Sequence, residues 1–467
     1  MKKIISLALI LNLSSAYASV VAIMDSGTDI THKDLAPKVW VNANEKAGST
    51  EDLDGSGLPG DINGWDFTEN RANPFNDKYN YLITDDVKKF YTLMAKYDLK
   101  TIKEDDFNWL KSISENKEVM NVVNFIGNYS HGTHVAGVAA LNNPNAKILG
   151  IKLLPTEFTP VKADKKKVEK KTDEKVPEQL EFDFVTKDSF EDFKKLVAKE
   201  AADQIMQMAP LSGYLDFHKV DVVNQSFGIS FMAAAEMLNG GFYQSLGRKA
   251  TEKELMEVLV VYFQTILAVG PEMFKAAPNT LFVVAAGNDA SNNDQLPDYP
   301  ASIKASNKIV VAATNGYSEL AEFSNFGAKS VEVAAPGVAI ESTGPAQSYI
   351  FMSGTSQAAP FVTNAIGLAK DANPALKAAD IKSIILKTVD VKDWLKGKVL
   401  TSGIVNKARV VRAAELSKTM NVEVAISKAR AEIADVAIQK SFSRRLPGMK
   451  IDFKPIMPSL LINLPKL

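Results

Sequence analysis

The stretch Val20-Val21-Ala22-Ile23-Met24-Asp25-Ser26-Gly27 gives the first indication of the fold. Its continuous apolar run is too short for a helix and is typical of a strand that is buried on both faces. Asp25 ends the run, and Gly27 permits a sharp turn directly after it. The stretch therefore predicts a strand of a parallel sheet that presents a carboxylate at its carboxyl end.

Similar apolar runs rich in β-branched residues recur at residues 148–154, 220–224, 281–286 and 309–313. Helical patterns occupy residues 131–141, 190–208, 252–267, 356–370 and 378–388. Because strands and helices alternate, the pattern predicts an α/β sandwich around a mainly parallel sheet. In such sheets the chemistry gathers at the carboxyl ends of the strands.

The composition excludes several classes of function. With 54 basic and 55 acidic side chains the net charge is -1, so no overall field attracts nucleic acid, and we expect no nucleic-acid partner. Cysteine is absent from the 467 residues, which excludes disulfides, thiolate nucleophiles and Cys-zinc sites.

Residues 1–18 have the pattern of a secretory signal: Lys2 and Lys3, an apolar stretch at 4–13, and the small-residue ending Ser14-Ser15-Ala16-Tyr17-Ala18. The alternatives are a buried N-terminal strand or a retained membrane anchor, although the apolar part is shorter than the ~20 residues of a spanning helix. We expect cleavage before Ser19, a secreted or periplasmic location, and no stable membrane insertion after cleavage.

Three further segments place reactive side chains where a strand or loop meets a helix. They are His131-Gly132-Thr133-His134-Val135-Ala136-Gly137, in which His131 is predicted to open a helix, Phe282-Val283-Val284-Ala285-Ala286-Gly287-Asn288, and Ser353-Gly354-Thr355-Ser356-Gln357-Ala358-Ala359-Pro360. Each has a plainer interpretation: a serine before a helix is usually a cap, and two histidines can bind a metal, although here no nearby acid offers a third ligand.

Together with Asp25, these segments supply a hydroxyl nucleophile, an imidazole base, a carboxylate that orients it and an amide for the oxyanion. They resemble the Asp, His, oxyanion-Asn and Ser motifs of the subtilisin-like serine proteases, the subtilases, in that family's chain order. The resemblance extends over about residues 19–416. It includes secondary matches such as Asn224-Gln225-Ser226-Phe227-Gly228 and Tyr299-Pro300-Ala301-Ser302.

The resemblance implies a three-layer α/β/α sandwich of the subtilisin-like kind with helical insertions. It implies a secreted serine endopeptidase that hydrolyses peptide bonds through an acyl-enzyme, with protein or peptide substrates. The catalytic residues it implies are Asp25, His131 and Ser356, with Asn288 as the oxyanion donor. The substrate-binding residues it implies are Ser226, Phe227 and Gly228 on one side and Ala285, Ala286 and Gly287 on the other wall of the primary specificity pocket.

Two rival classes of protein would leave different marks in the sequence. A non-catalytic protein on a protease-like fold is expected to have lost a triad member, and none is lost here. A lipase or esterase requires a Gly-x-Ser-x-Gly elbow and the order Ser, Asp, His, whereas this chain has Gly354-Thr355-Ser356-Gln357-Ala358 and the opposite order. Gln357 and Phe361 replace the Met and His that are usual near the nucleophile, and both changes leave the Gly-Thr-Ser core intact.

The domain organisation is predicted as a peptidase domain over residues 19–416 with insertions at about 77–121, 155–213 and 229–278, followed by a C-terminal extension at 417–467 whose role is not readable. The first insertion is interpreted as decoration. The lysine-rich segment 161–176 is interpreted as a solvated loop, with a basic binding patch as the alternative. The oligomeric state is not predicted.

Asp52, Asp54 and Asp61 form a candidate cation site in the stretch Asp52-x-Asp54-Gly55-Ser56-Gly57. Closely spaced carboxylates suit a hard cation such as calcium, but the spacing of an EF-hand loop is incomplete, which favours an ordinary acidic turn. The proposed chemistry requires no cofactor, so any calcium would be structural.

Specificity and maturation give two last expectations. A roomy apolar pocket at residues 285–287, with Asp289 able to admit a basic side chain, predicts broad specificity. Only the six residues 19–24 separate the predicted cleavage point from Asp25, which leaves no room for an N-terminal prodomain. We therefore expect activity without removal of an N-terminal propeptide, and any processing in the lysine-rich loop or the C-terminal tail.

Overall fold

The computed structural model describes residues 17–160, 189–437, 450–451 and 453–459. The predicted signal sequence up to residue 16 and the lysine-rich segment 161–176 lie outside the described residues.

A central sheet forms the core of the described chain, with the strand order β11-β12-β8-β6-β5-β4-β1-β3-β2 and β7 paired to β6. Neighbouring strands are parallel except for the pairs β11–β12 and β6–β7. The strands are β1 Val20–Asp25, β2 Gly64–Asp66, β3 Lys147–Lys152, β4 Val222–Gln225, β5 Leu281–Ala285, β6 Lys308–Asn315, β7 Glu319–Leu320, β8 Val333–Pro336, β11 Asp390–Val391 and β12 Gly403–Ile404. The five predicted strands are confirmed as its central members.

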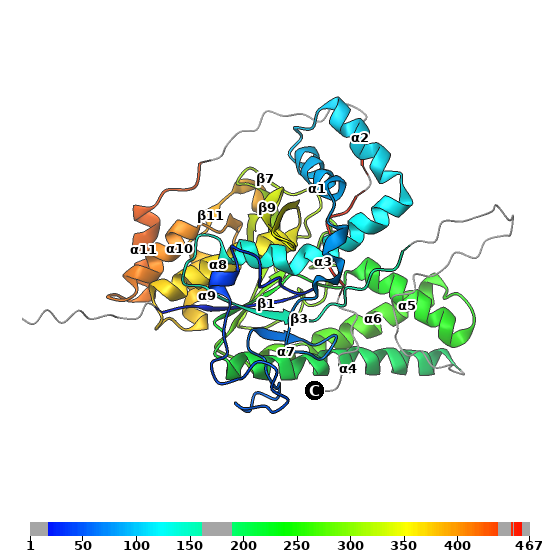
Figure 1. The fold of residues 1–467 in the computed structure, drawn as a ribbon, viewed down its shortest axis with the longest axis horizontal. Helices are drawn as coiled ribbons and strands as arrows, with labels where there is room; N and C mark the ends of the chain where they lie inside the picture. The colour runs from blue at the N-terminus through cyan, green and yellow to red at the C-terminus, as the bar shows by residue number, and fades with distance from the viewer. Residues whose placement is uncertain (1–16, 161–188, 438–449, 452, 460–467) are drawn as a thin grey trace, which may run out of the picture.

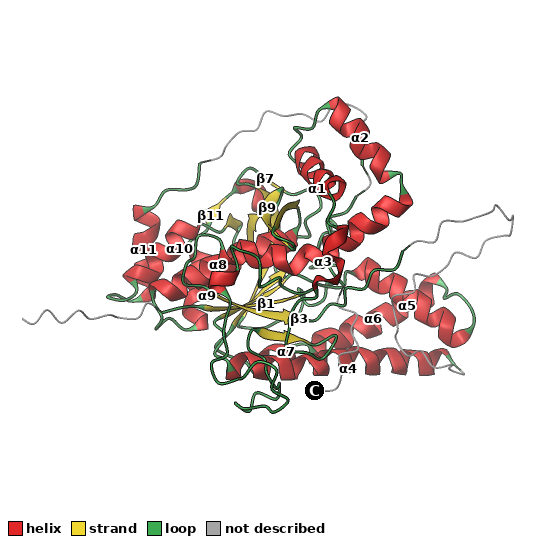
Figure 2. Ribbon diagram, in the orientation of Figure 1, coloured by secondary structure: helices red, strands yellow, loops and turns green. Residues whose placement is uncertain are grey.

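Helices cover both faces of this sheet, which gives the three predicted layers (Figure 1 and Figure 2). In β1, Val21 and Ile23 pack against one helical layer and Ala22 and Met24 against the other, because successive strand residues point to opposite faces. The first layer contains α3 Lys117–Ala140, α8 Thr355–Ala372, α9 Ala378–Lys387, α10 Lys407–Leu416 and α11 Val422–Glu432. The second contains α4 Phe190–Phe217, α5 Phe231–Leu246, α6 Glu252–Val269 and α7 Glu272–Lys275.

The predicted start of the helix that holds His131 was wrong. Helix α3 begins at Lys117, where the side chain of Asn116 accepts hydrogen bonds from the first backbone N–H groups, so His131 lies well inside the helix. The residues before His131 lack the small-residue pattern that follows it, which hid the earlier start. The insertion predicted at 77–121 therefore continues without a break into the helix of the site.

The insertion at 77–121, which the sequence led us to interpret as decoration, packs against the rest of the described chain. It contributes α1 Asp85–Asp98 and α2 Glu104–Ser114, and α1 packs on the hairpin of β9 Ile340–Gly344 and β10 Ser348–Met352. Aromatic residues of the insertion form an apolar cluster with Ile350, Met352 and the C-terminal residues Ile451 and Phe453. Figure 1 shows α1 and α2 projecting from the sandwich beside β9.

Within the described residues one segment, Glu252–Lys275, is long and apolar enough to cross a membrane by length and composition, and 33% of its apolar window is buried. Val258, Tyr262 and Ile266 of α6 pack into the core. Met256 and Val260 of the same helix are exposed.

Candidate active site

Asp25 and His131 form a buried pair at the carboxyl end of β1. Oδ1 of Asp25 lies 2.8 Å from Nδ1 of His131, and it also accepts the backbone N–H of Ser26 at 2.7 Å. Both side chains are fully buried. The carboxylate therefore fixes the proton on Nδ1 and leaves Nε2 as the basic nitrogen. Nε2 has no hydrogen-bond partner among the described residues.

Ser356 lies in the first turn of α8 and contacts the residue that follows β4. Its Oγ donates to the backbone carbonyl of Ser226 at 3.1 Å, and Oγ of Ser226 donates back to the carbonyl of Ser356 at 2.9 Å. This reciprocal pair holds the start of α8 against the end of β4. No hydrogen bond joins Ser356 to His131 among the described residues, so the hydroxyl must turn away from Ser226 to reach the imidazole.

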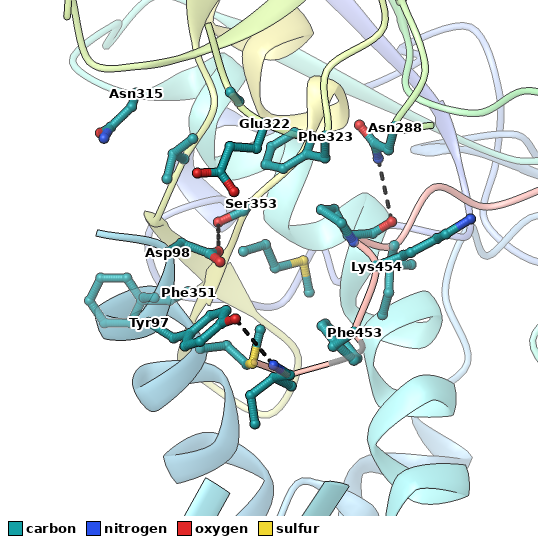
Figure 3. A pocket seen from close by; sticks show the side chains of 18 of the residues that line it. Tyr97, Asp98, Asn288, Asn315, Glu322, Phe323, Phe351, Ser353, Phe453 and Lys454 are labelled. Atoms are coloured by element: carbon teal, nitrogen blue, oxygen red, sulfur yellow. Dashed lines mark hydrogen bonds between the residues drawn. The ribbon is translucent and has the colours of Figure 1, made fainter. Parts of the chain in front are cut away.

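Asn288 follows β5 and is oriented by Thr355, the neighbour of Ser356. Oδ1 of Asn288 accepts the backbone N–H and the hydroxyl of Thr355, each at 2.9 Å. The Thr355 hydroxyl oxygen in turn accepts the N–H of Gly287 at 3.1 Å. With its oxygen engaged, the amide directs Nδ2 outward, where it donates to the carbonyl of Pro455 at 3.4 Å (Figure 3).

The predicted substrate-binding residues lie on both sides of this centre. Ser226 and Phe227 are buried, and the N–H of Gly228 donates to the carbonyl of Pro458 at 3.1 Å. Ala285 and Ala286 are fully buried in the core. Gly287 has a φ of +111°, a backbone conformation that favours glycine. A Cβ there would lie 2.2 Å from Nδ2 of Asn325.

Sequence reasoning missed Asp298, whose carboxyl group lies between the two glycines of this pocket. A Cβ on Gly228 would lie 3.0 Å from its Oδ1, and a Cβ on Gly287 would lie 2.7 Å from its Oδ2. Asp298 is 2% exposed, and burial raises the pKa of its carboxyl well above the usual range. Its position directly before the quoted Tyr299-Pro300 motif was the only signal available in the sequence.

The C-terminal extension reaches the same centre, although no motif in it indicated this role. We call its described residues 450–451 and 453–459 the cleft segment. Besides the contacts of Pro455 and Pro458, the N–H of Ile451 donates to the Tyr97 hydroxyl at 3.1 Å, and Nζ of Lys454 lies 3.6 Å from Oδ1 of Asp289. A cavity of about 360 Å³ lies between this segment, α1 and the loop after Asn288 (Figure 3).

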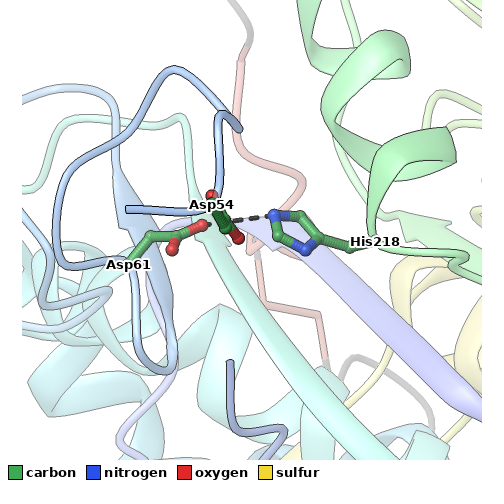
Figure 4. Close-up of side chains that lie close together, drawn as sticks. All are labelled: Asp54, Asp61 and His218. Atoms are coloured by element: carbon green, nitrogen blue, oxygen red, sulfur yellow. Dashed lines mark ion pairs between the residues drawn. The ribbon is translucent and has the colours of Figure 1, made fainter. Parts of the chain in front are cut away.

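The candidate cation residues do not form one group as predicted. Asp54 and Asp61 meet His218, at the end of α4, with Nε2 of His218 at 3.3 Å from Oδ2 of Asp61 (Figure 4). Asp52 groups instead with Glu45 and Asp54, and its oxygens accept two backbone N–H groups of its own turn. His218 was missed because the helix that bears it is remote in sequence from the acidic turn.

This donor set does not fit calcium. Nδ2 of Asn42 donates to both Asp54 and Asp61, at 2.8 and 2.7 Å, and the hydroxyl of Tyr214 donates to Asp61 at 2.7 Å, so the carboxylate oxygens already have partners. Calcium prefers several free oxygen ligands, and an imidazole is not one of them. The arrangement is that of a hydrogen-bonded acidic turn.

His134 has a structural position rather than a place in a metal pair with His131. Its Nε2 lies 3.0 Å from the carbonyls of both Ile340 and Ile350, which ties α3 to the β9–β10 hairpin. Burial lowers the pKa of His134 to about 3, so the imidazole is neutral at ordinary pH.

The buried Asp–His pair, the helix-start serine and the oriented amide thus lie at the carboxyl edge of a mainly parallel sheet in an α/β protein. The model of the subtilase family, Peptidase_S8, matches residues 17–414, and the chain belongs to that family. Membership confirms the predicted resemblance and the predicted subtilisin-like fold, and it supports the classification as a serine-type endopeptidase.

Individual relatives match over shorter stretches. The chain is 40% identical to the cell wall-associated protease of Bacillus subtilis over 112 residues, which is 24% of this chain and 12% of that protein. It is 40% identical to thermitase of Thermoactinomyces vulgaris over 122 residues, 25% of this chain and 41% of that protein. These matches span less than half the length of either relative. The solved A-subunit of the AB5 toxin from E. coli aligns at 17% identity over 88% of this chain and 92% of that one, with a TM-score of 0.43.

Proposed function

We propose that this chain is a serine endopeptidase that hydrolyses peptide bonds in proteins or peptides through an acyl-enzyme. The observation that supports this best is the buried contact of 2.8 Å between Oδ1 of Asp25 and Nδ1 of His131. It fixes the imidazole in the tautomer whose Nε2 can accept a proton, which is the role a serine nucleophile requires of its base.

In the proposed mechanism Ser356 rotates from the Ser226 carbonyl to His131 and attacks the substrate carbonyl carbon as its proton passes to Nε2. His131 then gives this proton to the leaving amine as the C–N bond breaks. Water next attacks the acyl-enzyme, again with His131 as base, and releases the acid product and the free Ser356 hydroxyl. Asp25 stays ionised throughout and stabilises the imidazolium.

Asn288 supplies the electrostatic part of this mechanism. Its Nδ2 donates to the carbonyl of Pro455, a backbone carbonyl within the cleft, and we assign the same donor to the oxyanion of the substrate. The backbone N–H of Ser356 is the second donor in this assignment. Thr355 holds the amide in place before the substrate arrives, so the reaction does not have to reorganise it.

Labelling with a fluorophosphonate probe, followed by mapping of the modified residue, tests this function. We expect label on Ser356, its loss in Ser356→Ala, and its retention in Ser353→Ala, a matched control three residues away. Absence of label from the folded chain would instead support the rival class, a non-catalytic protein on a protease fold.

We also propose export with cleavage between Ala18 and Ser19. The backbone nitrogen of Ser19 donates to Oδ1 of Asp371 at 2.8 Å, and Oδ2 of Asp371 has no partner among the described residues. A new α-ammonium group at Ser19 would place its positive charge against this carboxylate. N-terminal sequencing of the exported protein tests the proposal, and a first residue other than Ser19 contradicts it.

A further inference from the structure

The carboxyl group of Asp298 differs from other buried acids of this protein in having no partner. Asp66 pairs with Lys152 at 3.0 Å, and Asp390 pairs with Arg409 at 2.9 Å. Neither oxygen of Asp298 has a hydrogen-bond partner among the described residues. A buried polar group without a partner costs about 1–3 kcal/mol, so a chain that retains one at a reaction centre is expected to use it.

The charge of Lys308 lowers the pKa of the Asp298 carboxyl, but no ion pair joins the two side chains among the described residues. Nζ of Lys308 is engaged by the carbonyls of Pro300 and Ala301. The charge of Asp289 acts in the opposite direction and, with burial, raises the pKa of the Asp298 carboxyl. The pocket without substrate therefore favours the protonated, neutral carboxyl group, and a cation placed beside Asp298 would favour the carboxylate.

This buried carboxyl group lies beside a slot that a side chain of the cleft segment enters. Cε of Met457, in the cleft segment, lies 2.5 Å from the point where a side chain of Gly228 would begin, and Oδ1 of Asp298 lies 3.0 Å from the same point. A peptide side chain thus enters the slot beside Gly228 and ends near Asp298. On the opposite side, Gly287 immediately precedes Asn288, whose amide contacts a peptide carbonyl.

We propose that Asp298 is a specificity-determining residue that selects substrates with lysine or arginine directly before the cleaved bond. This inference rests on the proposed function and replaces the broad specificity expected from the sequence. A cationic side chain in the slot meets the carboxylate in a site with little water, where a charge-assisted hydrogen bond is at its strongest. Asp289 adds a second negative charge at the rim, where it already contacts Lys454.

Peptide substrates that differ only in the residue before the cleaved bond test this inference on the full chain. We expect kcat/KM for Arg and Lys to exceed that for Met and Leu by about 100-fold or more, because sites that satisfy a buried polar group reject analogues that leave it unpaired. Asp298→Asn is expected to abolish the preference, and Asp294→Asn, an exposed acid of the same loop, to keep it.

The outcomes separate this inference from the proposed function. Label on Ser356 together with an apolar preference that Asp298→Asn leaves unchanged would overturn the inference alone. Absence of both label and cleavage would overturn the proposed function and the inference with it. The wild-type profile decides the question even if Asp298→Asn fails to fold.

A second inference comes from the cleft segment. Gly228 and Asn288, which the family resemblance and the proposed mechanism assign to substrate, both donate to its backbone, to the carbonyls of Pro458 and Pro455. The same segment is anchored at its other end by the edge-to-face contact of Phe453 with Phe90, with ring centroids 5.2 Å apart, and by the Ile451–Tyr97 hydrogen bond. The anchor and the carbonyls that occupy the two donors are thus parts of one short peptide.

We propose that the cleft segment is a built-in competitive inhibitor of this active site. An intramolecular peptide acts at an effective concentration in the millimolar range, so even modest affinity keeps the site occupied. Release, by displacement or by cutting in the tail, would free both donors for substrate. This inference also rests on the proposed function.

The full chain with both Ile456→Asp and Met457→Asp tests the proposed inhibition, since both side chains are part-buried where the cleft segment packs on the rest of the chain. We expect kcat/KM to rise at least tenfold, and Val424→Asp, at an exposed position of α11, to leave it unchanged. A synthetic peptide of residues 450–459 is expected to inhibit the double variant competitively, while a scrambled peptide does not. An unchanged kcat/KM and no inhibition, in an enzyme that labels at Ser356, would refute the inference.

Discussion

Replacement of Thr355 by valine tests whether the amide of Asn288 is preoriented for catalysis. Valine keeps the shape of threonine but removes the hydroxyl that donates to Oδ1 of Asn288 at 2.9 Å and accepts the N–H of Gly287 at 3.1 Å. The backbone N–H of Thr355 remains as a donor to the same Oδ1, at 2.9 Å. The amide is therefore held by one hydrogen bond in place of two.

The magnitude follows from these contacts. Complete loss of one oxyanion donor lowers kcat by about 10²–10³, and Thr355→Val retains the donor but weakens its orientation, so we expect a fall in kcat of roughly tenfold to a hundredfold. KM should change little, because the oxyanion exists only in the transition state. The unpaired N–H of Gly287 should also lower the free energy of unfolding by about 1–3 kcal/mol.

Steady-state kinetics and urea denaturation of Thr355→Val and Thr355→Ser separate the two effects. Serine restores the hydroxyl and is expected to restore kcat. If Thr355→Val is destabilised but keeps the wild-type kcat under conditions where it is folded, Thr355 has only a structural role and the assignment of a preoriented amide fails.

Four other outcomes are expected from the structure. Ser356→Ala should lower kcat by on the order of 10⁶ with an unchanged unfolding curve, and Asn288→Ala should lower it by about 10²–10³ with little change in KM; full activity in either variant contradicts its assigned role. Because burial lowers the pKa of His134 from 6.5 to about 3, the unfolded chain binds a proton that the folded chain does not between these pH values. Stability should thus fall as the pH falls through that window, by up to about 1.4 kcal/mol per pH unit, and His134→Asn should weaken this dependence in denaturant titrations. Removal of calcium with a chelator should leave the thermal midpoint unchanged, since the oxygens of Asp54 and Asp61 already have partners; a clear drop would restore the calcium interpretation.

The sheet could be predicted from the sequence because its strands are buried on both faces and appear as continuous apolar runs. The Asp25–His131 pair could be predicted because each residue stands in a motif with a known role. The start of α3 could not, since the residues before His131 belong to an insertion that has no counterpart in the motif.

Asp298, His218 and the cleft segment depend on contacts between distant parts of the chain. A single aspartate in a loop has no periodicity, and only the fold places it between Gly228 and Gly287. The Pro-interrupted tail has apolar residues without any regular spacing, so the sequence does not indicate that this tail packs against α1.

The complete burial of His131 and Ser356 has to be reconciled with a polymer substrate, because buried groups cannot meet it without a movement. The cleft segment is bound at Gly228 and Asn288, the groups assigned to substrate. The polar contacts that bind it there contribute only a small free energy. The hydrogen bonds from the Gly228 N–H to Pro458 and from Asn288 Nδ2 to Pro455 contribute about 1 kcal/mol each, and the part-exposed Lys454–Asp289 pair contributes about 0–1 kcal/mol. A substrate that accepts the same two hydrogen bonds, from Gly228 and Asn288, compensates for those that the segment gives up. A basic side chain of the substrate adds an ion pair with Asp298, which the uncharged Met457 cannot form. Displacement is thus most favourable for a basic substrate, so the inhibitor and the specificity residue select the same ligands.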